Sequence, residues 1–179
     1  MEITSATWAV LGLIERKPRS GYDIKRIVDR TIRHFWAASP GQIYPELRRL
    51  ERAGWIAGDD EPRGGRRRRV YRITPEGTAA LRGWLAGMET RVELRDESLL
   101  RLFFSDAIPF EHGLGLLAGR REGYTRMYEY LRSLDDGSGV PDPPFVDLAY
   151  RWGLDYCKWG MDWCDQQAQR MREENERAA

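Results

Sequence analysis

The residues with the clearest chemistry are four consecutive arginines, Arg66, Arg67, Arg68 and Arg69. Guanidinium groups held this close together repel one another, and an anion that neutralises them relieves the repulsion. The phosphates of a nucleic acid are such anions, and the counterions that they release add affinity. Guanidinium groups also fit a narrow minor groove. A solvated basic loop is the alternative interpretation, so a second basic feature nearby is needed to decide.

That second feature is a helix predicted from about Pro40 to Ala53. Ser39 fits its N-cap and Pro40 its first position, and Gly54 fits its end. At about 100° per residue, Ile43, Leu47 and Leu50 share an inward face. The polar residues of the outward face and its flank are Gln42, Tyr44, Arg48, Arg49 and Arg52. Arginine can bind guanine and glutamine can bind adenine in the major groove, and both reach phosphates.

The elements around these residues predict a winged helix-turn-helix. Helices are expected at 5–15 and after Ser20, followed by the helix at 40–53, in which Pro45 predicts a local kink. Two short strands at 55–57 and 70–73 then enclose a polar turn, and Thr74 and Pro75 open a fourth helix. In such a unit the third helix enters the major groove. Tyr22, in the first turn of the second helix, lies beside free amides that suit a phosphate.

Several of these segments resemble the PadR family of transcription regulators. They are Ser20-Gly21-Tyr22-Asp23-Ile24, the run from Phe35-Trp36 through Ser39-Pro40-Gly41-Gln42-Ile43-Tyr44-Pro45, Leu47 to Leu50, Gly54, and the hairpin ending at Tyr71-Arg72-Ile73-Thr74. The similarity covers residues 6–87. It implies a homodimer that usually represses nearby genes, with the third helix and the wing on DNA. It also implies that Pro45 belongs inside the third helix.

The second half of the chain is predicted to be helical, with helices at 96–105, 110–134 and 145–176 and a linker at 135–144. The first of these carries Leu99, Leu100, Leu102, Phe103 and Phe104, and we expect it to be buried. Helix order and the region from Leu148 to Trp159 resemble the larger C-terminal domain of the virulence-regulator-like branch of the PadR family. The expected fold is therefore mainly α with a small β-hairpin: a winged helix-turn-helix domain at 1–90 and a helical dimerisation domain at 91–179.

The last predicted helix has two apolar faces. One is a seam with heptad spacing, made of Leu154, Cys157, Met161, Cys164, Ala168 and Met171. The opposite face carries Phe145, Leu148, Ala149, Trp152, Tyr156, Trp159 and Trp163. A helix that is apolar on both sides must be covered on both sides. One face can pack on its own chain, and the other needs a second copy or a small aromatic effector. The sequence leaves both faces as candidates for the dimer interface.

Charge and composition narrow the class of protein. Residues 1–90 hold 17 basic and 11 acidic residues, a net charge of +6, whereas residues 91–179 hold 12 and 17, a net charge of −5. No apolar run approaches the 18 residues of a membrane helix, and the N-terminus lacks the pattern of a signal peptide, so we expect a cytoplasmic protein. Cys157 and Cys164, about 10 Å apart along a helix, are expected to be reduced thiols.

The same survey gives no indication of catalysis. His34, His112 and the two cysteines lack the spacing of metal ligands, and no phosphate-binding glycine loop follows a strand. We therefore expect neither an enzyme nor a cofactor. Two functions fit what remains: a repressor that binds a pseudo-palindromic operator as a dimer, and a winged-helix module that binds another protein. The basic outward face favours DNA, and activation in place of repression fits the sequence equally well.

Overall fold

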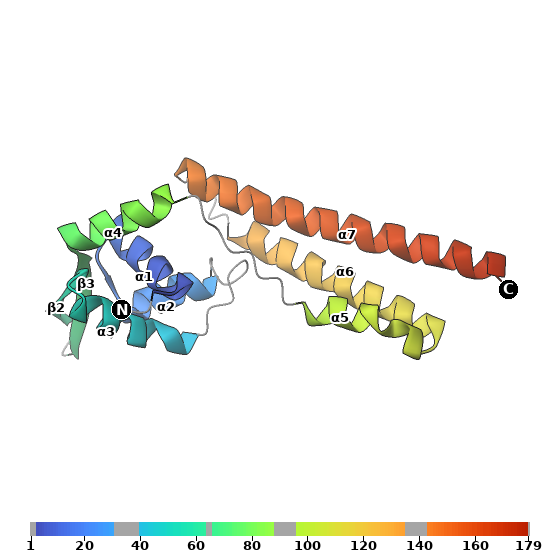
Figure 1. The fold of residues 1–179 in the computed structure, drawn as a ribbon, viewed down its shortest axis with the longest axis horizontal. Helices are drawn as coiled ribbons and strands as arrows, with labels where there is room; N and C mark the ends of the chain where they lie inside the picture. Colours follow the sequence, from blue (N-terminus) through green and yellow to red (C-terminus); the bar gives the residue numbers. More distant parts are fainter. Residues whose placement is uncertain (1–2, 31–39, 64–65, 88–95, 135–142, 179) are drawn as a thin grey trace. The chain divides into compact units, whose positions relative to one another are not determined.

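A computed structural model describes residues 3–30, 40–63, 66–87, 96–134 and 143–178 (Figure 1). The chain divides into two compact units, Met1–Arg91 and Val92–Ala179. In its described residues the first combines four α-helices with a small sheet, and the second is helical in the part that the structure describes. The expected class, mainly α with a winged helix-turn-helix, is confirmed. None of the helices in the described part is both long enough and apolar enough to cross a membrane.

The N-terminal unit contains α1 (Ser5–Arg16), α2 (Gly21–Arg30), α3 (Ile43–Arg52) and α4 (Pro75–Ala86). Its core is formed by the apolar faces of the first three helices, closed by residues of the sheet and of α4. The buried members are Val10, Leu11, Leu13, Ile14, Ile24, Val28, Ile43, Leu47, Leu50, Ile56, Tyr71 and Leu81. Because each large side chain contributes about 1.5–3 kcal/mol on burial, this cluster fixes α3 on the unit.

The start of α3 differs from the prediction. A 3-10 turn, η2 (Pro40–Gln42), precedes the α-helix, which begins at Ile43. Pro45 is therefore in the first turn of α3, where a backbone N–H has no acceptor within the helix. No helical bond is lost there, so the reason for the predicted kink disappears. Ser39, the predicted N-cap, lies outside the described residues.

The end of α3 follows the prediction. Gly54 has a φ of 73°, in the left-handed region that glycine adopts without strain. Its amide donates to the carbonyl of Glu51, and the amide of Trp55 donates to that of Leu50. These two bonds satisfy carbonyls at the helix end and turn the chain into the sheet.

The sheet contains β1 (Arg19–Ser20), β2 (Ile56–Arg63) and β3 (Arg66–Ile73), antiparallel in the order β1-β3-β2. The pairing of β2 with β3 runs from Ile56 opposite Ile73 to Arg63 opposite Arg66. The predicted polar turn over 59–69 is therefore wrong, because both strands continue through it. The arginine run lies in β3 itself.

Opposite charges explain why these polar strands pair. Arg72 lies 3.6 Å from Asp59 and 3.2 Å from Glu61, and Arg69 lies 3.6 Å from Asp60. Cross-strand pairs of opposite charge stabilise a ladder in which apolar residues are scarce. The predicted strands were too short because they were based on apolar residues alone, and pairs of opposite charge were not considered.

Three tryptophans stack across α1, the start of the hairpin and α4. The ring of Trp8 lies 5.7 Å from that of Trp55 and 5.2 Å from that of Trp84, with interplanar angles of 23° and 8°. Gly77 lets α4 approach the hairpin closely, because a Cβ there would lie 2.1 Å from the carbonyl oxygen of Trp55. The stack and this contact close the core on the side of α4.

The C-terminal unit contains α5 (Glu97–Phe103), a 3-10 turn η3 (Ser105–Ala107), α6 (Phe110–Ser133) and α7 (Pro144–Ala178). The helices α6 and α7 lie side by side and antiparallel (Figure 1), with Arg121 of α6 bonded to Asp165 of α7 at 2.7 Å. Gly160 permits the close approach, because a Cβ there would lie 2.5 Å from the ring of Tyr124.

The structure separates the two apolar faces of α7. Cys157 and Cys164 of the seam are buried, and the Sδ of Met161 accepts a hydrogen bond from Thr125 of α6. The middle of the seam therefore packs within its own chain, whereas Met171 at its end is exposed. On the opposite face, Trp152 and Trp159 are more than half exposed.

The predicted burial of the segment 96–105 is wrong in the single chain. No residue of α5 is buried, and Leu100, Phe103 and Phe104 are exposed. This short helix of two turns packs on α6 with one side. Its other side carries the exposed apolar residues. The C-terminal unit therefore presents two apolar surfaces, one on α5 and one on α7.

Candidate nucleic-acid interface

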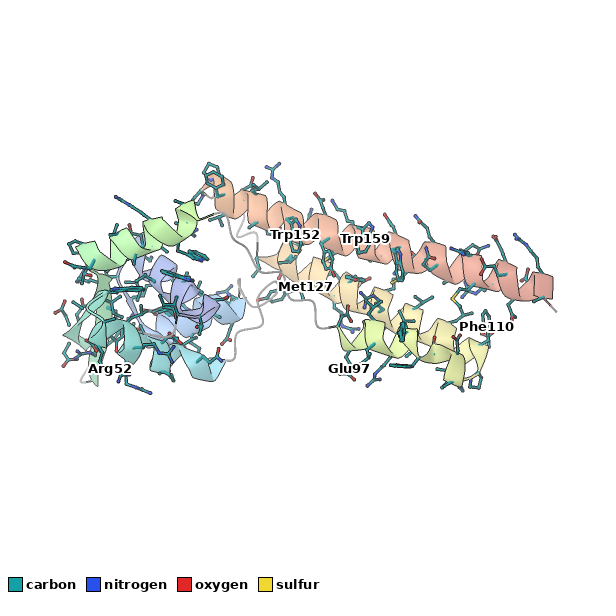
Figure 2. The ribbon with its side chains drawn as sticks, in the orientation of Figure 1. Arg52, Glu97, Phe110, Met127, Trp152 and Trp159 are labelled. Atoms are coloured by element: carbon teal, nitrogen blue, oxygen red, sulfur yellow. The ribbon has the colours of Figure 1, made fainter. Side chains whose placement is uncertain are left out.

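The outer face of α3 presents polar and aromatic side chains to solvent. Gln42, Tyr44, Arg48 and Arg52 are exposed, while Ile43, Leu47 and Leu50 are buried on the opposite side. Arg52, labelled in Figure 2, donates from Nε to the carbonyl oxygen of Arg48 at 3.2 Å. This arrangement leaves guanidinium, amide and phenol groups in a row along η2 and α3, which suits contacts to base edges and phosphates.

Arg49 is placed differently from the other predicted residues of α3. It is half-buried, and its Nη1 lies 3.0 Å from Oε1 of Glu46. Glu46 is only 4% exposed, and its other oxygen accepts a hydrogen bond from the hydroxyl of Thr7 at 2.9 Å. A buried carboxylate with two partners thus ties α3 to α1 and holds Arg49 at the flank of the exposed face.

Glu46 and Thr7 were not among the residues predicted for this site. A signal was present, because Ile43, Glu46, Leu47 and Leu50 fall at the i, i+3, i+4, i+7 spacing of a buried stripe. A carboxylate at such a position must find hydrogen-bond donors on a neighbouring element.

An open groove of about 550 Å³ lies where the beginnings of α2 and α3 meet β3. Its lining residues are Ser20, Gly21, Tyr22, Asp23, Arg26, Tyr44, Arg68, Arg69 and Tyr71. The structure thus brings together four of the predicted residues: Tyr22, Tyr44, Arg68 and Arg69. Arg26 was not predicted, although it stands four residues after Tyr22 and so on the same side of α2.

Gly21 allows α2 and α3 to meet at this groove. A Cβ at this position would lie 2.7 Å from Cε1 of Tyr44 and 3.0 Å from a methyl carbon of Leu47. A side chain here would therefore displace the tyrosine that forms one wall of the groove.

The described arginines of the predicted run are paired with carboxylates of the same chain. Arg68 bonds to Asp23 of α2. Arg69 donates to Glu51 of α3 at 2.6 Å, and this hydrogen bond raises the pKa of its guanidinium. The backbones of Arg66 and Arg67 lie in β3, but the structure does not describe their side chains. Ser39 lies outside the described residues.

Burial raises the pKa of the Tyr71 hydroxyl, and the charge of Glu51 adds to this effect. The phenol beside Arg69 therefore remains neutral at physiological pH and can act as a hydrogen-bond donor in the groove.

The predicted residues of α7 do not form a single site. Cys157 and Cys164 are buried, and burial raises the pKa of both thiols. Leu154, Met161 and Trp163 are half-buried. The exposed stripe is a stack in which the ring centroids of Trp152 and Tyr156 lie 5.3 Å apart and those of Tyr156 and Trp159 lie 6.0 Å apart. Figure 2 labels Trp152 and Trp159 on α7.

A polar cluster beside this stripe was not predicted. Arg120 donates to Asp96 and to the hydroxyl of Tyr124, each at 2.7 Å, and also bonds to Ser98. Burial raises the pKa of Tyr124 well above its usual value. Burial alone would also raise the pKa of Asp96, but hydrogen bonds from Ser98, Arg120 and the Leu99 amide outweigh it and leave the pKa below its usual range.

Within the described ranges, no three or more His, Cys, Asp or Glu residues gather in a way that could hold a metal ion. The geometry instead provides a helix with an exposed polar face beside a two-stranded wing and a groove containing arginines. These features define a winged helix-turn-helix protein.

The family follows from comparison with known proteins. Residues 10–83 match the model of the transcriptional regulator PadR-like family, and residues 94–172 match that of the virulence activator alpha C-term. The negative transcriptional regulator PadR of Bacillus subtilis is 33% identical over 99 residues, 54% of each chain. The N-terminal unit therefore contains a PadR-like domain, and the region that follows it matches the C-terminal domain of the virulence activators. It spans about half the length of the curated relatives that it matches.

Solved structures show the same fold along the chain. Bacillus subtilis PadR in complex with operator DNA aligns with a TM-score of 0.85 at 24% identity, covering 95% of this chain and 99% of that one. The same protein in complex with p-coumaric acid aligns with a TM-score of 0.76 at 24% identity, covering 93% and 98%. At this identity the similarity concerns the fold alone.

Proposed function

We propose that this chain is a sequence-specific DNA-binding transcriptional regulator, a repressor that binds a pseudo-palindromic operator as a homodimer. The observation that carries the proposal is the exposed row of Gln42 at the end of η2 and Tyr44, Arg48 and Arg52 on α3, beside the arginine-bearing strand β3. A helix of this kind reads base edges in the major groove, while the wing binds the adjacent backbone. In this proposal Tyr22, Ser39, Arg49 and Arg66 to Arg69 belong to the same interface.

The charge of α3 favours DNA over a protein partner. A protein-docking helix presents an apolar centre with few charges. Here the exposed face of α3 carries two guanidinium groups and an amide around one tyrosine. The match of residues 10–83 to the PadR-like family and the operator complex of Bacillus subtilis PadR support the same conclusion.

The C-terminal unit supplies the dimer contact in this proposal. Phe103 and Phe104 of α5 and Trp152 and Trp159 of α7 are exposed in the single chain, and a second copy would remove these rings from water. Because the middle of the seam, from Cys157 to Cys164, is already buried, the aromatic stripe is the face assigned to the partner copy.

A small aromatic effector that releases the regulator is the second part of the proposal. The complex of Bacillus subtilis PadR with p-coumaric acid supports it, as do the stacked rings of Trp152, Tyr156 and Trp159. The proposal also places the protein in the cytoplasm, where the DNA is, and assigns it no enzymatic activity.

The test is a titration of the full chain onto a labelled duplex from its own upstream region and onto a scrambled duplex, at two salt concentrations. We expect roughly a hundredfold or greater preference for the upstream duplex and a steep loss of affinity with salt. Equal, weak binding to both duplexes, repeated across a genomic library, would contradict operator recognition and favour the protein-interaction module. Addition of p-coumaric acid to the bound complex tests release.

A further inference from the structure

We propose that Arg68 and Arg69 are positioning residues that hold the wing, the hairpin of β2 and β3, against α2 and α3. These two arginines of the run then have a structural role and do not serve as phosphate contacts. Each of the two pairs that hold the wing is called a brace. The inference deepens the proposed function, on which it rests. Arg68 and Arg69 are adjacent in β3 but pair with carboxylates of different helices. Successive side chains of a strand point to opposite sides, which allows neighbours to reach two different elements.

The first brace joins β3 to α2 through Asp23. This carboxylate accepts hydrogen bonds from the amide of Ser20 at 3.2 Å and from its hydroxyl at 2.9 Å, and it also bonds to Arg68. The side chains of Arg68 and Asp23 are 29% and 22% exposed, so the pair is shielded more than a surface ion pair. The carboxylate that caps α2 is thus also the anchor of the wing.

Strand pairing places these two groups beside each other. In the β1–β3 register Ser20 lies opposite Val70, which is two residues from Arg68 along the strand. Asp23 follows Ser20 by three residues, in the first turn of α2. The hydrogen bonds between β1 and β3 and the ion pair between Arg68 and Asp23 therefore both hold β3 next to the start of α2.

The second brace joins β3 to α3 through Glu51. Arg69 donates to Glu51 at 2.6 Å, and its guanidinium carbon lies 6.0 Å from the centroid of the Tyr71 ring. Gly58 of β2 leaves space for this pair. A Cβ at Gly58 would lie 2.7 Å from Nε of Arg69 and 2.8 Å from Oε1 of Glu51.

These contacts predict that removing the carboxylate of Asp23 or Glu51 changes DNA affinity in the direction opposite to the one expected from charge alone. Removing a carboxylate beside DNA should strengthen binding, because it removes a repulsive charge. If the carboxylate holds the wing in place, its removal should weaken binding instead. The sign of the change in affinity therefore separates a brace from a phosphate contact.

The experiment measures operator affinity and its salt dependence for the full-length protein carrying Asp23→Asn, Arg68→Gln, and both changes. Asparagine keeps a side-chain oxygen that can accept from the amide and the hydroxyl of Ser20, so the contact at the start of α2 can be retained. We expect each single variant to bind roughly fivefold or more weakly, and the double variant no more weakly than the worse single. We also expect an unchanged slope of log K against log salt. The matched control is Glu76→Gln, which removes a charge from an exposed position in α4.

Two results would overturn the first brace. One is stronger binding by Asp23→Asn, which would mean that the carboxylate competes with DNA for Arg68. The other is a slope whose magnitude decreases by about 0.9 in Arg68→Gln, which is the change expected when one phosphate contact is lost.

For the second brace, Gly58→Ala and Glu51→Gln should each weaken operator binding with the slope unchanged. Stronger binding by either variant would overturn it.

Thermal unfolding tests the brace without DNA. Asp23→Asn and Arg68→Gln should each lower the melting temperature, and the double variant should melt no lower than the worse single, because both changes break one pair. Additive decreases would overturn the brace. If the unmodified protein shows no operator preference, the proposed function fails while this melting comparison still decides whether the pair exists.

Discussion

The two units of the molecule treat their apolar residues in opposite ways. In the described part of the N-terminal unit, fourteen apolar residues are buried and five large ones are exposed. In the described part of the C-terminal unit five are buried and eleven large ones are exposed. The first unit closes its own core around the helix that faces DNA in our proposal. The second leaves rings on α5 and α7 uncovered, which is the property expected of a unit completed by another copy.

This contrast indicates that the two units have different roles, DNA binding for the N-terminal unit and assembly for the C-terminal unit. Exposed residues of a closed unit can be changed with little effect on folding, so changes there should act on DNA binding. Exposed apolar residues of an open unit should act on assembly, and through assembly on every property of the regulator. The predictions below test that division.

The largest effect is expected from a charge in the exposed stripe. Trp159→Glu should convert the dimer into a monomer, because a carboxylate would have to be buried without a partner in the interface. Operator affinity should fall by roughly 100-fold, because two linked half-sites bind much more tightly than one. Sedimentation velocity and the duplex titration measure the two changes, with Arg172→Gln on the same helix as the control. A Trp159→Glu protein that remains dimeric would place the interface elsewhere.

The second largest effect is expected from the exposed face of α3 in the N-terminal unit. Arg48→Ala should cost about 1–3 kcal/mol of binding free energy on the operator and relax the base preference at one position. Gln42→Ala should do the same at another position. The melting temperature should remain near that of the unmodified protein, because both residues are exposed. A uniform loss on all DNA sequences would mean that these residues contact only the backbone.

A smaller effect is expected inside the closed unit. Thr7→Val removes the hydroxyl that donates to the buried carboxylate of Glu46. The N-terminal unit should lose about 1–2 kcal/mol of stability, because Glu46 keeps Arg49 as its other partner. Urea unfolding measures the loss. Thr78→Val, which removes an exposed hydrogen bond to Glu15, is the control and should change stability less. Equal losses in both variants would contradict a special role for the buried network.

The smallest effect concerns the polar cluster of the open unit. The pKa of Asp96 is lowered in the folded protein, so its ionised form stabilises α5 and α6 above the ordinary pKa of about 3.9. That contribution is lost as the pH falls through the lowered pKa. Asp96→Asn should therefore melt a few degrees lower at pH 7, and the difference should vanish in strong acid. Asp147→Asn, which breaks an exposed pair with Arg151, should show little difference at any pH.

Much of the fold could be predicted because it depends on local patterns. The order of the helices, the outward face of α3 and its end at Gly54 follow from spacing and from single residues. The strand β1 could not be predicted in this way, since two residues carry no pattern and exist as a strand only through pairing with Tyr71 and Val70. The exposure of Phe103 and Phe104 likewise depends on which elements are present to cover them.

The candidate site shows the same limit. The positions of Tyr44, Arg48 and Arg52 follow from helical geometry. The different environments of Arg68 and Arg69 depend on Asp23 and Glu51, which lie 45 and 18 residues away in the sequence. A run of identical residues cannot indicate which of its members have partners elsewhere in the chain.

The stack of Trp8 on Trp55 and Trp84 has an optical consequence. Indole rings at these separations and nearly parallel orientations couple their electronic transitions, which gives circular dichroism that isolated indoles lack. The stack joins α1, the hairpin and α4, so it is lost when any of the three separates from the others. The N-terminal unit therefore carries a spectroscopic signal of its own tertiary packing, which Trp84→Phe would weaken.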